Sequence, residues 1–115
     1  MSDWSTKRKR RQRVSRLWIV SDSDSKQHPN NGCYVMQTSG PQRGLLKQLA
    51  SGPTGCEVCG CEFTPDGQTL FLSIQHPGEG DGATLENPRS HWPDGNGRPA
   101  RASLLAIERK DGGVI

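Results

Sequence analysis

The sequence is poor in apolar side chains. Hydrophobic residues make up 30% of the 115 residues and aromatic residues 5%, whereas soluble domains usually have about 45–50% apolar residues with glycine included. The length suits one domain and is too short for two. A chain of this size buries little surface on its own. The composition therefore predicts either a loop-rich domain of short strands or a part of a larger assembly.

Long hydrophobic runs are also missing. The longest apolar stretches are a few residues, such as LWIV at 17–20, whereas a transmembrane helix needs about 20. The basic start is not followed by the apolar segment of a secretory signal peptide. As written, the chain is expected to lie in the cytoplasm and to have no membrane span.

Cysteine is scarce and irregularly spaced. An even number of cysteines, Cys33, Cys56, Cys59 and Cys61, is compatible with disulfides, but their spacing does not show the pairing. The run C-x-x-C-x-C suggests a zinc knuckle with Cys33 or His28 as a fourth ligand. Structural zinc sites usually combine two knuckles, however, and no second C-x-x-C exists. The alternative is a strand with buried thiols, in which Cys59 and Cys61 would share one face.

Positive charge is concentrated at the start of the chain. Residues 1–18 contain seven lysines and arginines against one aspartate, while the remainder is mildly acidic. Residues 1–15 are predicted to be a disordered basic arm. Such an arm can make weak contacts with nucleic acid, and the alternative is a solvated tail.

Short segments rich in β-formers alternate with turn formers. They predict an all-β fold, an antiparallel meander of five or six strands. Residues 45–52 are compatible with a helix, but the flanking turns favour a strand. The expected strands lie at residues 16–22, 32–38, 45–52, 56–63, 68–75 and within 102–113.

Residues 56–75 predict a β-hairpin. The TPDG sequence at 64–67 is typical of a β-turn, and Leu70, Leu72 and Ile74 alternate with more polar positions. Gly60 inside the first strand suggests a bulge. Residues 76–101 predict a long polar loop, which is more often functional than a short one. A further strand is expected to begin at the final VI.

Several motifs together resemble the PhoX-like secreted alkaline phosphatases. They are GCEVCGCEFTPDGQTLFLSIQHPGEG, SHWPDG and IERKDGGVI, joined by RLWIVSD and the segment from NNGCYVMQ to LASGPTG. The resemblance covers residues 16–115 and implies about one to two blades of an incomplete β-propeller. It also implies a phosphomonoesterase that uses calcium and iron and is periplasmic or secreted when intact. Most of the family's length and its export signal are not found in this sequence, so the chain alone is not expected to be active.

The resemblance also suggests site residues. Glu57 and Asp22 are candidate metal ligands, because calcium and iron favour oxygen donors; the alternatives are a solvated glutamate and a turn aspartate. Asp24 is a weaker candidate of the same type. Candidate substrate residues in the long loop are His76, Glu79 and His91.

Two other functions fit the residues without the resemblance. One is a non-catalytic β-rich module with a basic tail that binds nucleic acid. The other is a small zinc-binding module built on the cysteines.

Overall fold

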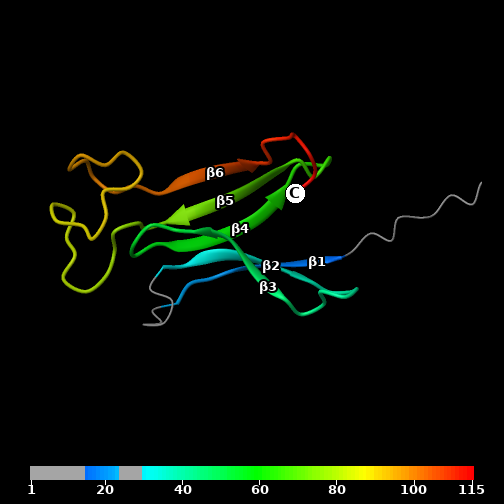
Figure 1. The fold of residues 1–115 in the computed structure, drawn as a ribbon. Helices are drawn as coiled ribbons and strands as arrows, with labels where there is room; N and C mark the ends of the chain where they lie inside the picture. Colours follow the sequence, from blue (N-terminus) through cyan, green and yellow to red (C-terminus); the bar gives the residue numbers. More distant parts are fainter. Residues whose placement is uncertain (1–14, 24–29) are drawn as a thin grey trace, which may run out of the picture.

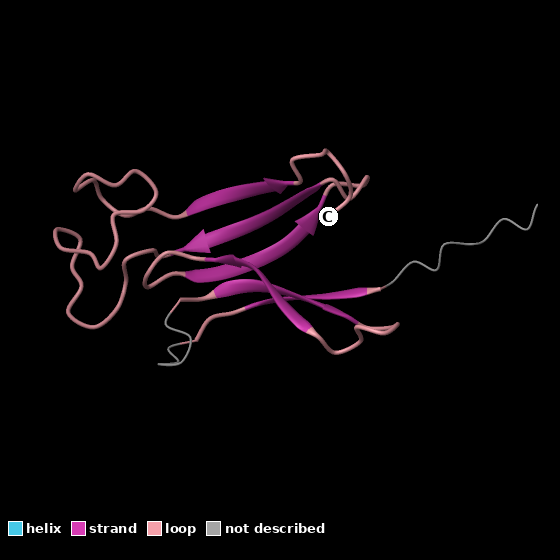
Figure 2. Ribbon diagram, in the orientation of Figure 1, coloured by secondary structure: helices cyan, strands magenta, loops and turns pink. Residues whose placement is uncertain are grey.

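The computed structural model describes residues 15–23 and 30–115, and these residues form strands and loops without any helix (Figure 2). The described part therefore has no helix that is long and apolar enough to cross a membrane. The expected arm at 1–15, apart from residue 15, lies outside the described residues, as do Asp24 and His28. The strands are β1 (Arg16–Val20), β2 (Gly32–Gln37), β3 (Leu46–Ser51), β4 (Glu57–Phe63), β5 (Thr69–Gln75) and β6 (Ser103–Glu108).

The strands form two antiparallel sheets of three strands each. Their orders are β1-β2-β3 and β4-β5-β6, so within each sheet the strands pair in sequence order. The two sheets lie side by side, with β1 and β2 in contact with β4 (Figure 1). The predicted all-β meander is confirmed, and so is the strand reading of residues 45–52.

The core lies between the two sheets and is small. The alternation of β5 is confirmed, because the exposed fractions of Leu70, Leu72 and Ile74 are 0%, 1% and 2%. Burying one such side chain stabilises a fold by about 1.5–3 kcal/mol. Trp18 of β1 meets Phe63 of β4 edge to face, with ring centroids 5.1 Å apart. This contact joins the middle of β1 to the end of β4.

A bulge in β4 changes which way its side chains point. Cys59 pairs with Ser73, but the register has shifted by the time Glu62 pairs with Phe71, and Gly60 has a φ of 67°. The predicted bulge is confirmed. The expectation that Cys59 and Cys61 share a face is wrong, because the extra residue turns Cys61 toward the core.

The predicted turn and loop are both present. The Gly67 amide donates to the Thr64 carbonyl at 2.8 Å, which closes the β4–β5 turn. Residues 76–102 contain no strand and project from one end of the sheets (Figure 1). The expected strand at the final two residues is wrong: they form no strand, and the Ile115 amide makes a single bond to the Gly67 carbonyl.

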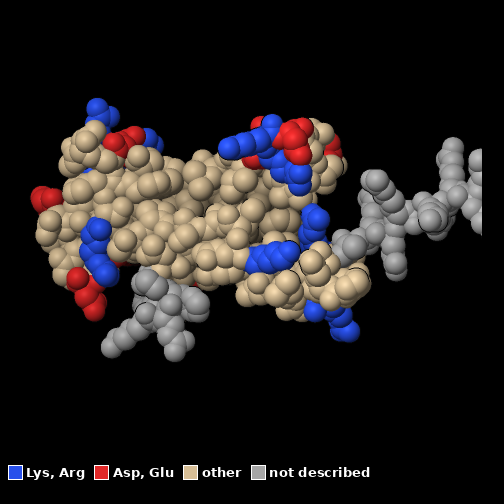
Figure 3. Space-filling model, viewed as in Figure 1, with Lys and Arg blue, Asp and Glu red and all other residues tan. Residues whose placement is uncertain are grey.

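Charged side chains gather at the two ends of the molecule. On the face shown in Figure 3, lysines, arginines and acids cluster at the loop end and at the turn end, while the surface over the strands between them is largely uncharged. The polar chemistry of the chain is therefore to be sought at the ends of the strands.

Candidate metal centre

Three segments bring an acid, an acid and a histidine together at the loop end of the sheets. Asp22 follows β1, Glu57 begins β4, and His76 follows β5. One ligand atom from each side chain lies within 4.8 Å of the other two. Within residues 15–23 and 30–115, this is the group of acids, histidines and cysteines whose spacing suits a metal ion. The sequence predicted Asp22 and Glu57 as metal ligands and His76 as a substrate residue, but not that the three side chains meet.

Asn31 fixes the position of Asp22. Its Oδ1 accepts bonds from the Ser23 amide at 2.8 Å and the Ser21 hydroxyl at 3.1 Å, on either side of Asp22. Its Nδ2 donates to the carbonyl of Cys56, the residue before Glu57, at 2.9 Å. Asn31 is only 7% exposed. One buried amide therefore holds both candidate carboxylates in place.

A backbone bond adds to this connection. The Val58 amide donates to the Ser21 carbonyl at 3.2 Å, which joins the end of β1 to β4. Asp22 directly follows Ser21 in the chain, and Glu57 directly precedes Val58. The two acids are thus positioned by strand geometry as well as by Asn31.

Glu57 is half-buried and already engaged. Its Oε1 accepts a bond from the Cys59 thiol at 2.6 Å, and its Oε2 lies 3.5 Å from His76 Nε2. The bond to Glu57 is the main cause that raises the pKa of Cys59 to about 11, with burial and the Glu57 charge adding to it. Cys59 is therefore a neutral thiol at ordinary pH and serves as a donor to the carboxylate.

His76 is oriented through its Nδ1 atom. Nδ1 lies 3.1 Å from the Gly55 carbonyl and 2.8 Å from Glu79 Oε2. Both neighbours are acceptors, so Nδ1 carries the proton and Nε2 is left facing Glu57. Burial lowers the pKa of His76, but the Gly55 carbonyl, Glu79 and Glu57 outweigh burial and raise it above 6.5.

The turn before β4 holds the segment that carries His76. The Gly78 amide donates to the Thr54 carbonyl at 2.8 Å. The Glu79 backbone packs directly on Gly55, where a Cβ atom would collide with the Glu79 carbonyl. Gly55 also has a φ of 77°, which a residue with a side chain rarely adopts. A glycine at this position lets the two loops approach closely.

A polar cavity of about 390 Å³ opens beside this group. Asp22, Asn31, His76 and Glu79 line it, together with Arg89 from the long loop. Arg89 and Asn31 were missed in the sequence, where PNNG and NPRS resemble ordinary turn segments. Their position in the folded chain is what identifies Arg89 and Asn31 as residues of this cavity.

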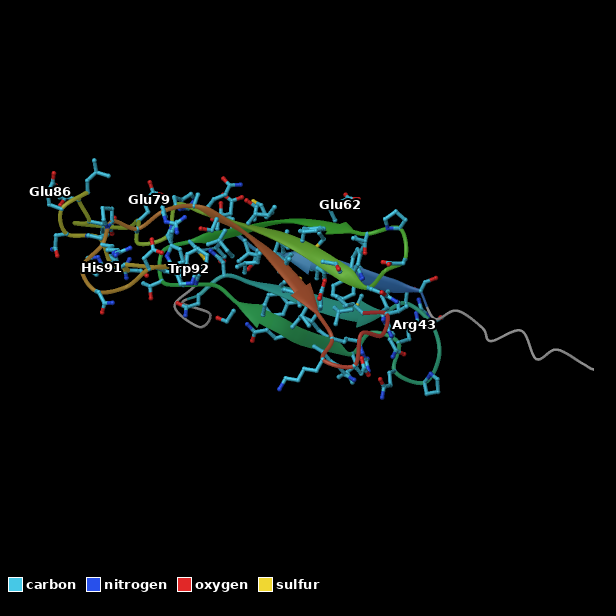
Figure 4. The ribbon with its side chains drawn as sticks, turned by 90° about the horizontal axis from the view of Figure 1, so that it is seen from above. Arg43, Glu62, Glu79, Glu86, His91 and Trp92 are labelled. Carbon is cyan, nitrogen blue, oxygen red and sulfur yellow. The ribbon has the colours of Figure 1, made fainter. Side chains whose placement is uncertain are left out.

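Of the other two candidate residues, Glu79 lies beside this cluster and His91 lies apart from it. Glu79 contacts His76, whereas His91 bonds through Nδ1 to the Arg98 carbonyl at 2.7 Å inside the loop. Figure 4 shows Glu79 and His91 at the loop end, with Arg43 at the opposite end of the sheets. A contact of His91 with substrate stays a prediction.

The cysteines do not form a zinc knuckle among the described residues. Cys59 bonds to Glu57, Cys56 lies against Gly52, and Cys61 faces Cys33 with their sulphurs 3.8 Å apart. The bulge at Gly60 separates the thiols of the C-x-x-C-x-C run. His28, the other suggested ligand, is outside the described part.

Comparisons with known proteins relate the chain to one family. The sequence model of the alkaline phosphatase PhoX family matches residues 12–78, more than half of the chain. The solved structure of Pseudomonas fluorescens PhoX in complex with vanadate, a transition state analogue, is similar with 38% identity and a TM-score of 0.68. No curated protein matches.

The match to the solved structure is extensive for this chain and partial for the relative. It covers 87% of this chain and 17% of the Pseudomonas protein. The two sheets correspond to a part of the β-propeller of such phosphatases, and a propeller blade usually has four strands. Sequence and structure together show that the chain belongs to the PhoX family of alkaline phosphatases.

Proposed function

We propose that this chain supplies part of the metal site of a phosphatase that hydrolyses phosphate monoesters. The convergence of Asp22, Glu57 and His76 is the observation that carries the proposal. The Pseudomonas relative was solved with vanadate, a transition state analogue, and vanadate imitates phosphate during transfer. The family and the geometry thus support the same chemistry.

The donor set fits the metals that the family resemblance implies. Calcium binds carboxylate oxygens, and iron binds carboxylates and imidazole. A histidine that ligates a metal usually donates its other ring N–H to a carboxylate or a backbone carbonyl. His76 does so toward Glu79 and Gly55, which leaves Nε2 on the side of Glu57.

Each residue then has a defined task. Asp22, Glu57 and His76 would hold the metal, Glu79 would orient His76, and Arg89 would place a positive charge in the same cavity. A metal bound there would polarise the phosphate ester and stabilise the charge that develops during hydrolysis. We also expect the intact enzyme to be periplasmic or secreted, as the resemblance implies.

Metal binding by matched variants tests the proposal. Calcium affinity of the full chain is measured by equilibrium dialysis, and bound iron by elemental analysis. Asp22→Asn and Glu57→Gln keep the side-chain size and remove one charged ligand, so each should weaken binding at least tenfold, because changes to residues that only support ligands already cost about 10–100-fold.

The control is Glu62→Gln, which removes the same charge from the same strand. Glu62 lies beyond the bulge and is exposed, and its label in Figure 4 stands away from Glu79. Binding by Glu62→Gln should stay within about twofold of the unmodified chain, as expected for an exposed residue outside a site. Equal losses in all three variants would contradict the proposed site.

A further inference from the structure

Two cysteines from different sheets meet in the core. Cys33 of β2 and Cys61 of β4 have their sulphur atoms 3.8 Å apart. Cys33 is 0% exposed, and Cys61 is half-buried against the same core cluster. The pair lies between the two sheets and is separate from the group formed by Asp22, Glu57 and His76.

The backbone makes this pairing selective. The bulge at Gly60 turns Cys61 inward, while Cys59 points to Glu57 on the other face. Cys56 is buried against Gly52. The fold therefore resolves a pairing that the sequence spacing left open.

We propose that Cys33 and Cys61 form a disulfide that joins the two sheets, with a small disulfide such as oxidised glutathione as the oxidant. The Cys61 thiolate attacks one glutathione sulphur, breaks the glutathione disulfide and releases the first glutathione as a thiol. The Cys33 thiolate then attacks Cys61 Sγ and releases the second glutathione thiol. Two cysteine thiols lose two electrons and two protons, and the oxidant takes up both.

The order of the two attacks follows from exposure. Cys61 is the thiol that a solvent-borne disulfide can reach, and Cys33 is enclosed. Burial, together with the charge and hydrogen bond of Cys61, raises the pKa of Cys33 to about 12. Cys33 is thus unsuited to attack first, but it lies next to the sulphur that it must attack second.

The geometry leaves a short distance to close. A disulfide bond is about 2.05 Å long, so the sulphurs must approach by about 1.8 Å from their separation of 3.8 Å. The bond would close a long loop from β2 through β3 to β4. Closing such a loop restricts the unfolded chain and stabilises the folded one.

Peptide mapping of the full chain tests the proposal. The reduced chain is incubated near pH 8 with oxidised and reduced glutathione, quenched with excess N-ethylmaleimide in strong urea so that buried thiols such as Cys56 are also labelled, digested and analysed by mass spectrometry. We expect a cross-linked peptide pair containing Cys33 and Cys61, and maleimide on Cys56 and Cys59. The same reaction in strong urea should scatter the pairing among the neighbouring cysteines.

Two variants serve as matched controls. Cys59→Ser should still yield the Cys33–Cys61 bond, and Cys61→Ser should leave Cys33 as a thiol that reacts with maleimide only after unfolding. The oxidised chain should also unfold at a higher urea concentration, and dithiothreitol should abolish that gain. The wild-type map decides the matter even if a variant fails to fold: a different dominant pairing, or Cys33 left free, would overturn the proposal.

Discussion

Asn31 shows how one buried side chain can organise a site without touching its ligand. It bonds to Ser21, Ser23 and the Cys56 carbonyl, and the two candidate acids are adjacent to these partners. An alanine there would leave buried donors and acceptors without partners. The cost of such a loss is about 1–3 kcal/mol.

We expect Asn31→Ala to weaken calcium binding and to loosen the end of β1. Amide hydrogen exchange should quicken at Ser23, which loses its acceptor, and at Val58, whose bond to Ser21 depends on the same contact. Asn87→Ala, in the exposed part of the long loop, is the control and should leave both readouts unchanged. Unaltered exchange at Ser23 in Asn31→Ala would show that the amide does not hold this segment.

Individual residues show how much of the candidate site could be predicted from the sequence. The family resemblance suggested Asp22 and Glu57 as metal ligands and His76 as a substrate residue, whereas residue chemistry alone left a turn aspartate and a solvated glutamate as alternatives. Their meeting could not be predicted, since it depends on the bond between the Val58 amide and the Ser21 carbonyl. Asn31 gave no signal at all, because PNNG has the composition of a turn.

Close contact between two loops determines where His76 lies. The turn at residues 53–56 packs on residues 76–79 through Gly55, whose φ of 77° and missing Cβ make room for the Glu79 backbone. Local sequence predicts a turn at both places. It does not predict that the turn at residues 53–56 packs against residues 76–79 and holds them in place.

Gly55→Ala should therefore separate the loops and disturb His76. Gly82→Ala is a matched control, because Gly82 has a φ of 76° but no atom within 4 Å of an added Cβ. Both variants suffer the strain of a left-handed residue, about 1–2 kcal/mol, and only Gly55→Ala adds a collision. We expect faster proteolysis within 76–102 and weaker calcium binding for Gly55→Ala alone. Similar effects in both variants would mean that strain, and not the contact, is responsible.

The β4–β5 turn contains an acid whose role is structural, as the PDG sequence predicted. Asp66 Oδ1 accepts bonds from the Thr64 hydroxyl at 2.6 Å and the Gln68 amide at 3.0 Å. The Thr64 bond and then the Gln68 bond lower the pKa of Asp66 below 3.8. The bulge of β4, which precedes this turn, was predictable from Gly60, but its effect on Cys61 was not.

The direction of that shift sets the pH dependence of the turn. The stabilising bonds are fully present above pH 3.8, the ordinary pKa, and are lost as the pH falls through the lower pKa of the folded state. We expect the Asp66 carboxyl carbon and the Gln68 amide to titrate together below pH 3.8 in NMR spectra. In Asp66→Asn the Gln68 amide should no longer follow that transition. A midpoint at or above 3.8 would contradict the bonding described.

The whole molecule has a small core and open strand edges. The described residues include six buried hydrophobic side chains, while leucines such as Leu46 and Leu49 of β3 are 50% and 40% exposed. Strands β1, β3, β4 and β6 are the edges of their sheets. The low apolar content noted in the sequence is explained by this arrangement, because propeller blades rely on neighbouring blades to cover such surfaces.

The candidate metal group also offers fewer ligands than a calcium ion needs. Asp22, Glu57 and His76 offer one ligand atom each in the group, whereas calcium takes about 6–8 oxygen ligands. The chain spans 17% of the length of the Pseudomonas relative. A metal held by so few residues keeps most of its positions open to water and is poorly placed to orient a phosphate ester.

We therefore expect the full chain to show no hydrolysis of an aryl phosphate above background, with or without added calcium and iron. Catalysis by metal ions depends on fixed coordination and a shaped, enclosed site, and the cavity beside Asp22 is open to solvent at the loop end. The assay compares the chain with Glu57→Gln, purified in the same way, so that a contaminating phosphatase gives equal rates in both. Turnover that persists through purification and disappears in Glu57→Gln would show that these residues already form a complete active site.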